Sequence, residues 1–329
     1  MTLADDLAEA WYGKRRSPWW TWPLAGLYGT LTALRRMLYR IGVLRRVCLP
    51  VPVIVIGNLT AGGTGKTPLT IALAAELRGR GFRPGVVSRG HGGSRRESML
   101  LDETPDPAVV GDEPCLIRAG GVPVAVGRDR PAAAQLLLAA GCDVLIADDG
   151  LQHYRLARDV EICVIDGVRR FGNGHLLPAG PLREPLRRLD RVDLRVCNGG
   201  EAQAGEHPMR LVGGEAVSLD GLRMQPLEGF AGQRVYAVAA IGNPARFFAN
   251  LSAAGIEVIE HAFPDHHAFI ATDLAYGDEL PVLMTDKDAV KCRAFAQPHW
   301  WRVPVHAELP VAFFEAVVAR LPQGAQERP

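Results

Sequence analysis

The six cysteines of this 329-residue chain include no C-x-x-C pair and no spacing typical of a metal-binding module. This absence argues against a zinc site and against a disulfide framework. We expect most of the cysteines to be small buried residues of a protein in a reducing compartment.

Net charge is almost absent as well, because 37 basic and 36 acidic side chains leave a formal charge of +1. No global positive field favours nucleic acid as a partner, so an anionic ligand must meet a local patch. The chain also has no internal repeat or low-complexity tract, and no obligate protein partner is evident. With 48% apolar and 22% charged residues, it has the composition of a globular protein long enough for two domains.

Long apolar runs are lacking, with one borderline exception near the N-terminus. Residues 17–34 carry no charge, but Pro23, Gly26 and Gly29 dilute the run, and it is barely long enough to span a bilayer. Trp19, Trp20 and Trp22 lie at its beginning, and a cluster of arginines follows it. Tryptophans and arginines of this kind are typical of a headgroup interface.

Two interpretations of this segment stay open. In the first, residues 1–50 form a helical segment that lies on, or dips into, the cytoplasmic leaflet of the membrane. In the second, the apolar stripe of a helix docks on the protein's own core; its members are Leu24, Leu27, Tyr28, Leu31, Leu34 and Leu38. Both can hold at once, since one face can dock while the tryptophans face lipid. The acidic N-terminus does not have the order of a secretory signal, so we expect the body of the protein to stay in the cytoplasm.

Residues 51–68 form an apolar strand that runs into a glycine-rich turn ending in Gly65-Lys66-Thr67. This layout is typical of a P-loop, in which backbone N–H groups at a helix N-terminus bind phosphate. Lys66 is expected to reach the β- and γ-phosphates and Thr67 to ligate Mg²⁺. The strict pattern has glycine where this chain has Thr60. The predicted ATP-binding residues are Asn58, Thr60, Ala61, Gly62, Gly63, Thr64, Gly65, Lys66 and Thr67.

Beyond the P-loop, apolar runs alternate with helical stretches, which predicts βαβ units and a mostly parallel sheet. Strands are expected at 52–56, 84–87, 122–126, 144–147, 160–165 and 194–197, and helices at 68–80, 113–119 and 131–140. The fold class is therefore α/β, a P-loop NTPase-like α/β/α sandwich with a second, smaller α/β domain. We expect the nucleotide-binding domain at 51–206, a two-stranded ribbon linker at 207–228 (strands 209–212 and 216–219), and the smaller domain at 229–329, whose last helix can pack back on the core.

Paired carboxylates end one of the predicted strands. Asp148 and Asp149 follow the run 144–147, the arrangement that a Walker B element uses to face the Mg²⁺ of a P-loop. The sequence therefore predicts both aspartates as metal ligands.

Two further clusters suit acid–base chemistry. Asp112 and Glu113 precede a predicted helix, where they serve either as helix cap and first-turn charge or as catalytic carboxylates. His266 and His267 follow Asp265 in the predicted smaller domain. An Asp/His pair across a cleft would suit removal of a proton from a hydroxyl, although paired loop histidines are more often merely exposed.

Arginines in glycine-rich loops complete the candidate set. Ser88 and Arg89, and then Arg128 and Arg130, follow predicted strands, and a third basic loop spans 171–185. Arginine suits bidentate capture of phosphate.

These motifs, taken together in their order, resemble the tetraacyldisaccharide 4′-kinases, the lipid A 4′-kinases of Gram-negative bacteria. The resemblance runs over nearly the whole chain. It includes the Trp/Arg-rich N-terminal helix, the P-loop, Ser-Arg-Gly at 88–90, Gly-Asp-Glu-Pro at 111–114, Ala-Asp-Asp-Gly-Leu-Gln-His at 147–153, Phe-Gly-Asn-Gly at 171–174, Leu-Pro-Ala-Gly-Pro-Leu-Arg-Glu-Pro at 177–185, Phe-Pro-Asp-His-His at 263–267 and Thr-Asp-Lys-Asp-Ala-Val-Lys at 285–291.

The resemblance implies transfer of the γ-phosphate of ATP to the 4′-hydroxyl of an acylated glucosamine disaccharide phosphate at the cytoplasmic face of the bacterial inner membrane. It implies that Asp112 is the general base, partnered by His266, and that Lys66 serves the triphosphate. Motif positions associated with Mg-ATP fall on Asp148, Asp149 and Glu184. Ser88, Arg89, Arg128 and Arg130 are the expected substrate contacts.

Two positions depart from the family's usual residues. His91 stands where Tyr is usual, and Asp286 where Glu is common; we expect neither to touch the core chemistry.

Two other functions remain as alternatives, a P-loop kinase or ligase of a soluble metabolite and a nucleotide-dependent membrane switch. Ala61 argues against the switch, since the partitioning ATPases have lysine before their paired glycines.

Overall fold

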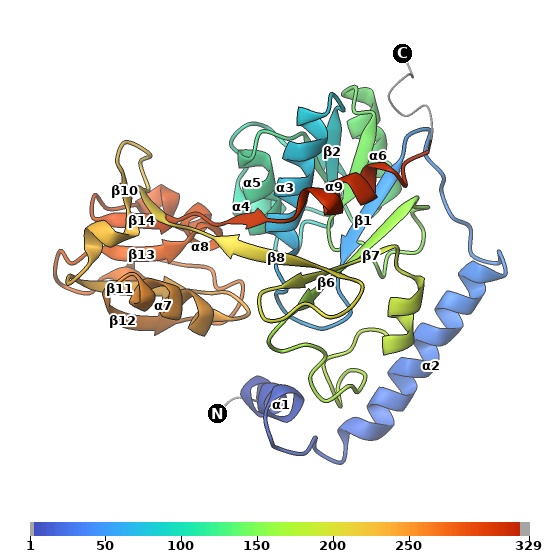
Figure 1. Cartoon of the computed structure of the whole chain (residues 1–329), viewed down its shortest axis with the longest axis horizontal. Coiled ribbons are helices and arrows are strands. Elements are labelled where there is room, and N and C mark those ends of the chain that lie inside the picture. Colours follow the sequence, from blue (N-terminus) through green and yellow to red (C-terminus); the bar gives the residue numbers. More distant parts are fainter. Residues whose placement is uncertain (1–2, 323–329) are drawn as a thin grey trace.

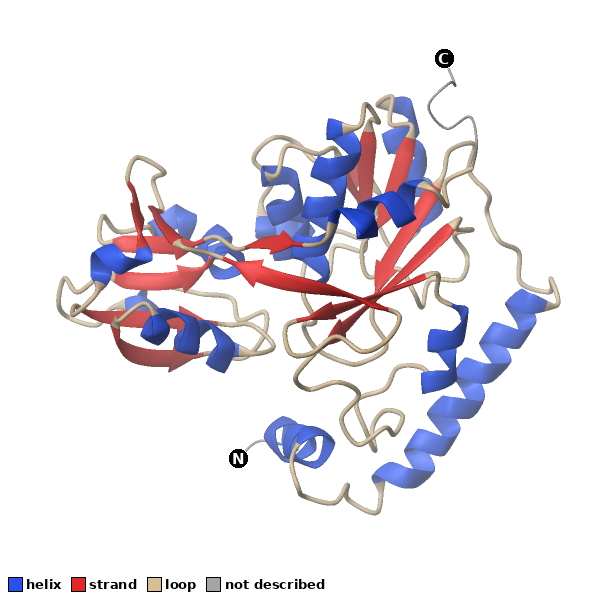
Figure 2. Cartoon of the chain, in the orientation of Figure 1, coloured by secondary structure: helices blue, strands red, loops and turns tan. Residues whose placement is uncertain are grey.

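The computed structural model describes residues 3–322 and consists of a larger unit around a nine-stranded sheet and a smaller unit around a six-stranded sheet (Figure 1). Helices flank the strands in both units (Figure 2). The α-helices are α1 (Leu3–Tyr12), α2 (Thr21–Arg40), α3 (Lys66–Gly79), α4 (Pro107–Val110), α5 (Asp112–Ala119), α6 (Arg130–Ala139), α7 (Pro244–Ala253), α8 (Asp286–Cys292) and α9 (Val311–Val318). Short 3₁₀ helices are η1 (Leu186–Arg191), η2 (Leu227–Phe230), η3 (Ala271–Leu274) and η4 (Arg293–Phe295).

The larger sheet is parallel except at its two edges, β15 and β3. Its order is β15 (His306–Glu308), β8 (Glu206–Val212), β7 (Leu194–Asn198), β6 (Val160–Asp166), β1 (Val53–Gly57), β5 (Val144–Ala147), β2 (Pro84–Ser88), β4 (Val124–Val126) and β3 (Met99–Leu100). The predicted alternation of strands and helices is confirmed, with ends that differ by one or two residues. Because the strands are parallel, the loops after β1, β2, β4 and β5 meet at one edge of the sheet.

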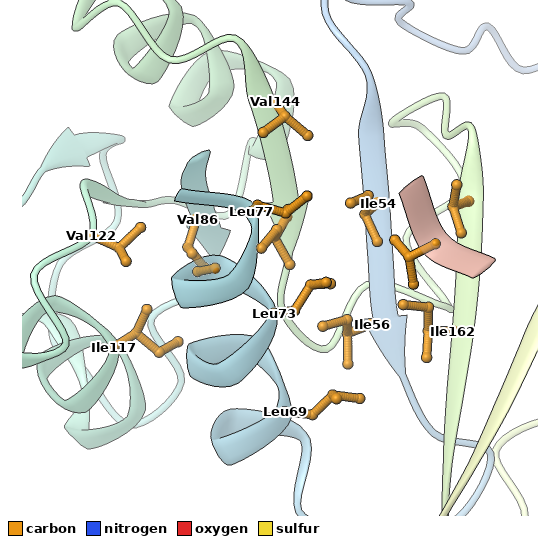
Figure 3. Packing of buried hydrophobic residues seen from close by; sticks show 14 of the residues in the cluster. Ile54, Ile56, Leu69, Leu73, Leu77, Val86, Ile117, Val122, Val144 and Ile162 are labelled. Atoms are coloured by element: carbon orange, nitrogen blue, oxygen red, sulfur yellow. The ribbon is translucent and has the colours of Figure 1, made fainter. Parts of the chain in front are cut away.

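Alternate residues of the central strand β1 bury themselves on opposite faces of the sheet. Ile54 and Ile56 pack with Leu73 of α3 in one core cluster, which also contains residues of α5 and α9 (Figure 3). Val53 and Val55 pack with residues of α6 in a second cluster. Each fully buried aliphatic side chain of this kind contributes about 1.5–3 kcal/mol. These layers confirm the predicted α/β/α sandwich and place α9 on the core of the larger unit.

The smaller sheet has the order β10 (Met224–Pro226), β9 (Glu215–Ser218), β14 (Trp300–Val303), β13 (Val282–Thr285), β11 (Arg234–Ala239) and β12 (Glu257–Ala262). Its last four strands are parallel, and β9 and β10 are antiparallel additions. Separate apolar clusters lie on its two faces, so the smaller unit has its own core.

The predicted ribbon between 209–212 and 216–219 is wrong. Strand β8 pairs with β7 and β15 in the larger sheet, whereas β9 pairs with β10 and β14 in the smaller one. The two glycines between them carry the chain from one sheet to the other, and a Cβ on Gly213 would lie 2.6 Å from the carbonyl oxygen of Pro304 on the returning strand. The two-stranded connection therefore consists of β8 and β15 (Figure 1). The boundaries predicted at 206 and 228 do not separate the sheets, because β9 and β10 belong to the smaller one.

Helix α2 stands at the periphery of the larger unit (Figure 1). Its inner face is anchored by Tyr28, whose hydroxyl donates to the carbonyl oxygen of Arg183 at 3.0 Å. The leucine row that one interpretation docked on the core faces outward instead. Its members are 46% to 58% exposed: Leu24, Leu27, Leu31 and Leu34. Across residues 3–322, no helix combines the length and apolar character needed to cross a bilayer.

Candidate active site

A cavity of about 1200 Å³ lies where the carboxyl ends of the larger sheet meet the smaller unit. On the side of the larger unit it is lined by the P-loop, by the loops after β2, β4 and β5, and by the start of α5. On the side of the smaller unit it is lined by α7 and α8. Sequence segments more than 200 residues apart therefore share one cavity.

The P-loop leaves β1 and enters α3 through glycines in left-handed conformation. Gly62 has φ +97° and Gly65 has φ +90°, a region that side chains rarely adopt. A Cβ on Gly65 would lie only 2.4 Å from Nδ2 of Asn198, which itself donates to the carbonyl oxygen of Thr64 at 3.0 Å. Glycine is thus required there by both backbone and packing. The loop residues that line the cavity are Gly62, Gly63, Thr64, Gly65, Lys66 and Thr67.

Three predicted nucleotide residues support the loop from behind instead of lining the cavity. Asn58 is fully buried, and its amide donates to the carbonyl oxygens of Thr60 and Gly62 at 2.8 and 3.3 Å. Its Oδ1 accepts from Nζ of Lys66 at 3.3 Å. The backbone N–H of Ala61 donates to the carbonyl oxygen of Pro181. Their role here is to hold the loop's shape.

Asp148 and Asp149 end β5 beside Lys66. Lys66 Nζ lies 3.5 Å from Oδ1 of Asp149. Burial raises the pKa of Asp149, but the positive charges of Lys66, Arg183 and Arg130 outweigh it and hold the pKa well below its ordinary value. Asp148 is 1% exposed; burial, with the charges of Glu113 and Asp149, raises its pKa to about 7.

The chemistry of this pair fits Mg²⁺. Oδ1 of Asp148 accepts from Thr70 at 3.2 Å, while its buried Oδ2 has no hydrogen-bond partner. A divalent cation would satisfy that oxygen and favour the ionised carboxylate. No group of three or more His, Cys, Asp or Glu side chains with the geometry of a metal site occurs among residues 3–322. Mg²⁺ needs fewer, since it is usually held by one or two carboxylates and the phosphates of the substrate.

Glu184, also predicted as a metal ligand, does not line the cavity, and its role as a ligand stays a prediction. It is 2% exposed, and its oxygens are engaged by Arg36 at 3.3 Å, Gln152 at 3.4 Å and the hydroxyl of Tyr154. Arg188 lies 3.7 Å away. The carboxylate does not line the cavity; it holds α2 to the larger unit through Arg36.

Asp112 meets His266 at the wall of the cavity, which His266 lines. Asp112, 5% exposed at the start of α5, lies 3.2 Å from Nδ1 of His266 in the smaller unit. Burial raises the pKa of Asp112, but the hydrogen bond from His266 and the charges of Lys287 and Lys291 lower it below its ordinary value. The hydrogen bond to Asp112 raises the pKa of His266.

The choice between the two histidines is resolved by their contacts. His267 lies 2.9 Å from Asp273 within the smaller unit, away from Asp112. His266 has φ +61°, an uncommon conformation for a residue with a Cβ. Backbone strain of this kind is concentrated at functional sites.

Lys287, at the start of α8, was not singled out by the sequence. Its Nζ lies 3.2 Å from Asp265, 3.4 Å from Glu113 and 3.4 Å from Nε2 of His266. The positive charge of Lys287 therefore lies beside both members of the Asp112–His266 pair. The Thr-Asp-Lys-Asp motif was visible, but no local signal shows that its lysine meets a carboxylate 174 residues away.

The expectation that His91 stays clear of the core chemistry is wrong. Its ring lies edge-on to that of His266, with centroids 5.0 Å apart. Asp286 accepts from Arg302 at 2.7 Å and lies away from the Asp112–His266 pair.

The four predicted substrate contacts divide into two groups. All four line the cavity. Arg89 and Arg128 are exposed and without a partner in the described chain, so they are free to bind an anion. Arg130 is 3% exposed and donates to the carbonyl oxygen of Asp149 at 2.8 Å. Its role is to hold the loop that carries the aspartates.

Two other arginines, Arg183 in the lining of the cavity and Arg169 beside it, were not predicted as site residues. Arg183 lies 3.1 Å from both oxygens of Asp149. Arg169 donates to the carbonyl oxygens of Gly63 and Gly242, which joins the P-loop to the smaller unit. Arg183 belongs to the motif at 177–185, whereas Arg169 lies in none of the motifs that carry the family resemblance.

Comparisons with known proteins show the family of this chain. A family model described as "Tetraacyldisaccharide-1-P 4'-kinase" matches residues 17–322. The tetraacyldisaccharide 4'-kinase of Stenotrophomonas maltophilia is 54% identical over 322 residues, which covers 94% of this chain and 95% of that protein. That of Xanthomonas euvesicatoria pv. vesicatoria is 54% identical over 325 residues, 94% of each.

A solved structure shares the fold. LpxK from Aquifex aeolicus, in an "apo" form crystallised in complex with ATP, is 28% identical with a TM-score of 0.75, and the match covers 91% of this chain and 98% of that one. Sequence, cavity and fold agree, and the chain belongs to the tetraacyldisaccharide 4′-kinase family.

Proposed function

We propose that this chain phosphorylates its sugar hydroxyl with Asp112 as the proton acceptor and His266 as its partner. As a member of its family, the chain is an ATP-dependent kinase of the tetraacyldisaccharide of lipid A biosynthesis. The observation that carries the proposal is the 3.2 Å contact of Asp112 with His266, which lines the same cavity as the P-loop. Neither alternative, a soluble-metabolite enzyme or a membrane switch, matches the family.

The reaction forms a bond between the acceptor's 4′-oxygen and the γ-phosphorus and breaks the bond from that phosphorus to the β,γ-bridging oxygen. ADP leaves with the bridging oxygen, and the hydroxyl proton passes to Asp112. Its lowered pKa makes it a weak base on its own, and the adjacent Nδ1 of His266 lets the pair share the proton. Phosphoryl transfer has a loose transition state, so positioning and charge stabilisation supply most of the rate.

The nucleotide side of the cavity supplies that charge. Backbone N–H groups of residues 62–67 bind the phosphates, and Lys66 provides a cation at the leaving group. Asp148, Asp149 and Thr67 are the residues that would hold Mg²⁺, which when bound neutralises charge on the phosphates. On the acceptor side, Arg89 and Arg128 are the unpaired cations available to the substrate's own phosphate.

The membrane is where an acylated acceptor resides, and α2 offers a surface for it. Trp19 is 82% exposed and Trp22 49% exposed, and the outward leucine row continues along the helix. Exposed tryptophans and leucines on one helix are typical of an interfacial segment. We therefore place the enzyme at the cytoplasmic face of the bacterial inner membrane, held by α2.

The direct test incubates the protein with Mg²⁺, ATP and the tetraacyldisaccharide 1-phosphate. A new phosphate monoester on the distal sugar is expected, detected by mass spectrometry and by phosphorus NMR. The Lys66→Met variant is the matched control, because it keeps most of the side chain's length and removes the phosphate-binding cation. Transfer to a deacylated sugar in place of the lipid would contradict the proposal.

A further inference from the structure

A second cavity of about 900 Å³ lies on the other side of α2, between that helix, η1 and the segment 154–161. It shares no lining residue with the active-site cavity. Its walls carry seven arginines and four carboxylates, so the groove has a surplus of positive charge. The arginines are Arg36, Arg40, Arg46, Arg158, Arg187, Arg188 and Arg191.

Three of the four carboxylates of this groove are occupied by the protein itself. Asp159 accepts from the backbone N–H of Val53 at 2.8 Å, and Asp193 from that of Glu161 at 2.7 Å. Glu161 is paired with Arg158 at 3.0 Å and with Arg188 at 2.5 Å. The fourth carboxylate, Asp190, is 77% exposed and lies 3.8 Å from Arg195, which does not line the groove. The arginines of the groove therefore still outnumber the carboxylates that could neutralise them.

Four arginines remain unpaired. Within the described chain, Arg40, Arg46, Arg187 and Arg191 make no hydrogen bond or ion pair, and all four are exposed. They come from three separate segments, the end of α2, the chain after it and η1. Guanidinium groups that converge in this way suit bidentate binding of phosphate oxygens.

The groove opens beside apolar surface. Met37 lines it and is 49% exposed, and Ile41 and Val43, which follow on the chain, are 61% and 64% exposed. A ligand with a phosphate and an adjacent hydrocarbon chain matches both features, whereas a free anion would use only the arginines. The groove therefore favours a lipid.

We propose that the groove between α2 and η1 is a binding site for the phosphate headgroup of an anionic phospholipid. This inference rests on the proposed location of α2 at a membrane surface and adds a specific lipid contact to it. The acceptor's own phosphate is expected in the active-site cavity, at Arg89 and Arg128, and does not compete for this groove.

The test compares binding to vesicles of phosphatidylcholine with and without phosphatidylglycerol. Arg187→Gln/Arg191→Gln removes two groove arginines that lie outside α2. The matched control, Arg16→Gln/Arg45→Gln, removes the same charge from exposed, unpaired arginines of the N-terminal segment that do not line the groove. We expect the groove variant to bind phosphatidylglycerol vesicles about 30-fold more weakly, with the control changed by a few-fold at most. Binding to phosphatidylcholine alone should stay the same for all three proteins.

Several outcomes would overturn the headgroup site. Equal losses in the two double variants would mean diffuse attraction without a site. Displacement of the wild type from vesicles by inorganic phosphate, beyond that by chloride of equal ionic strength, would assign the groove to a free anion. A raised KM for the acceptor in detergent, caused by the groove variant, would assign it to the substrate. Absence of phosphoryl transfer by the wild type, with the vesicle result intact, would refute the proposed function alone.

Discussion

Replacing Asp112 with asparagine removes the proposed proton acceptor but preserves the volume of a side chain that is only 5% exposed. The amide can still lie against Nδ1 of His266, so the two units keep their contact at this point. What changes is the basicity of the oxygen and the negative charge that faces Lys287 at 3.8 Å and Lys291 at 4.0 Å.

A positioned general base contributes about 10²- to 10⁴-fold to a rate. The barrier for Asp112→Asn should therefore rise by about 3–5 kcal/mol, which appears as an equal fall in kcat. The KM for ATP should change little, because the contacts of the Asp112 side chain are with His266, the backbone N–H of Glu113 and the lysines of α8, and none is with the P-loop.

The assay is single-turnover transfer from radiolabelled ATP to the lipid acceptor, with ATP saturating. Asp102→Asn is the matched control, since it makes the same change at a nearby exposed aspartate that does not line the cavity. A kcat for Asp112→Asn within about tenfold of the wild type would remove Asp112 from the base role. A large rise in the KM for ATP would instead mean that the substitution acts through the nucleotide site.

Three other substitutions address separate parts of the structure. Asp148→Asn should raise the half-saturating Mg²⁺ concentration by about tenfold or more, and an unchanged Mg²⁺ titration of kcat would contradict the metal assignment. The hydrogen bond to Asp112 raises the pKa of His266, and the charge of Lys287 lowers it. We expect kcat/KM to fall as pH drops through that pKa. Lys287→Met should move this acid limb of the pH profile to higher pH, and a shift to lower pH would refute the charge argument. Phe313→Ala should destabilise the protein by about 3–5 kcal/mol in urea unfolding, because Phe313 of α9 is fully buried in the larger core; a loss below about 1 kcal/mol would mean that α9 docks only loosely.

Local signals predicted the parts of the site that lie close together in sequence. The P-loop and the aspartates after β5 were found because the chain places strand, turn and helix within about twenty residues. Parallel strands then bring their carboxyl ends to one edge whatever the details of packing. The same logic placed Ser88, Arg89 and Arg128 at the cavity, which the structure confirms.

Local sequence signals did not predict contacts between distant segments of the chain. The ribbon prediction failed because paired glycines serve equally in a hairpin turn and in a crossing between two sheets. The sequence also did not predict the direction of individual side chains. Arg128 and Arg130 are two residues apart, yet Arg130 is buried against Asp149 and Arg128 is exposed. The Asp112–His266 pairing came from the family resemblance, and only the fold supplies the reason that the two residues meet.

Glu184, predicted as a metal ligand, takes part in polar contacts between α2 and the larger unit. Its carboxylate is held by Arg36 of α2, and the amide of Gln152 donates both to Glu184 at 3.4 Å and to the carbonyl oxygen of Asn58 at 3.1 Å. Asn58 in turn accepts from Lys66. A continuous chain of polar contacts therefore runs from the proposed membrane helix to the phosphate-binding lysine. Because every step is buried or partly buried, a displacement of α2 would leave a buried carboxylate short of a partner, which is costly. Polar contacts thus connect α2 with the P-loop through Glu184, which does not line the cavity.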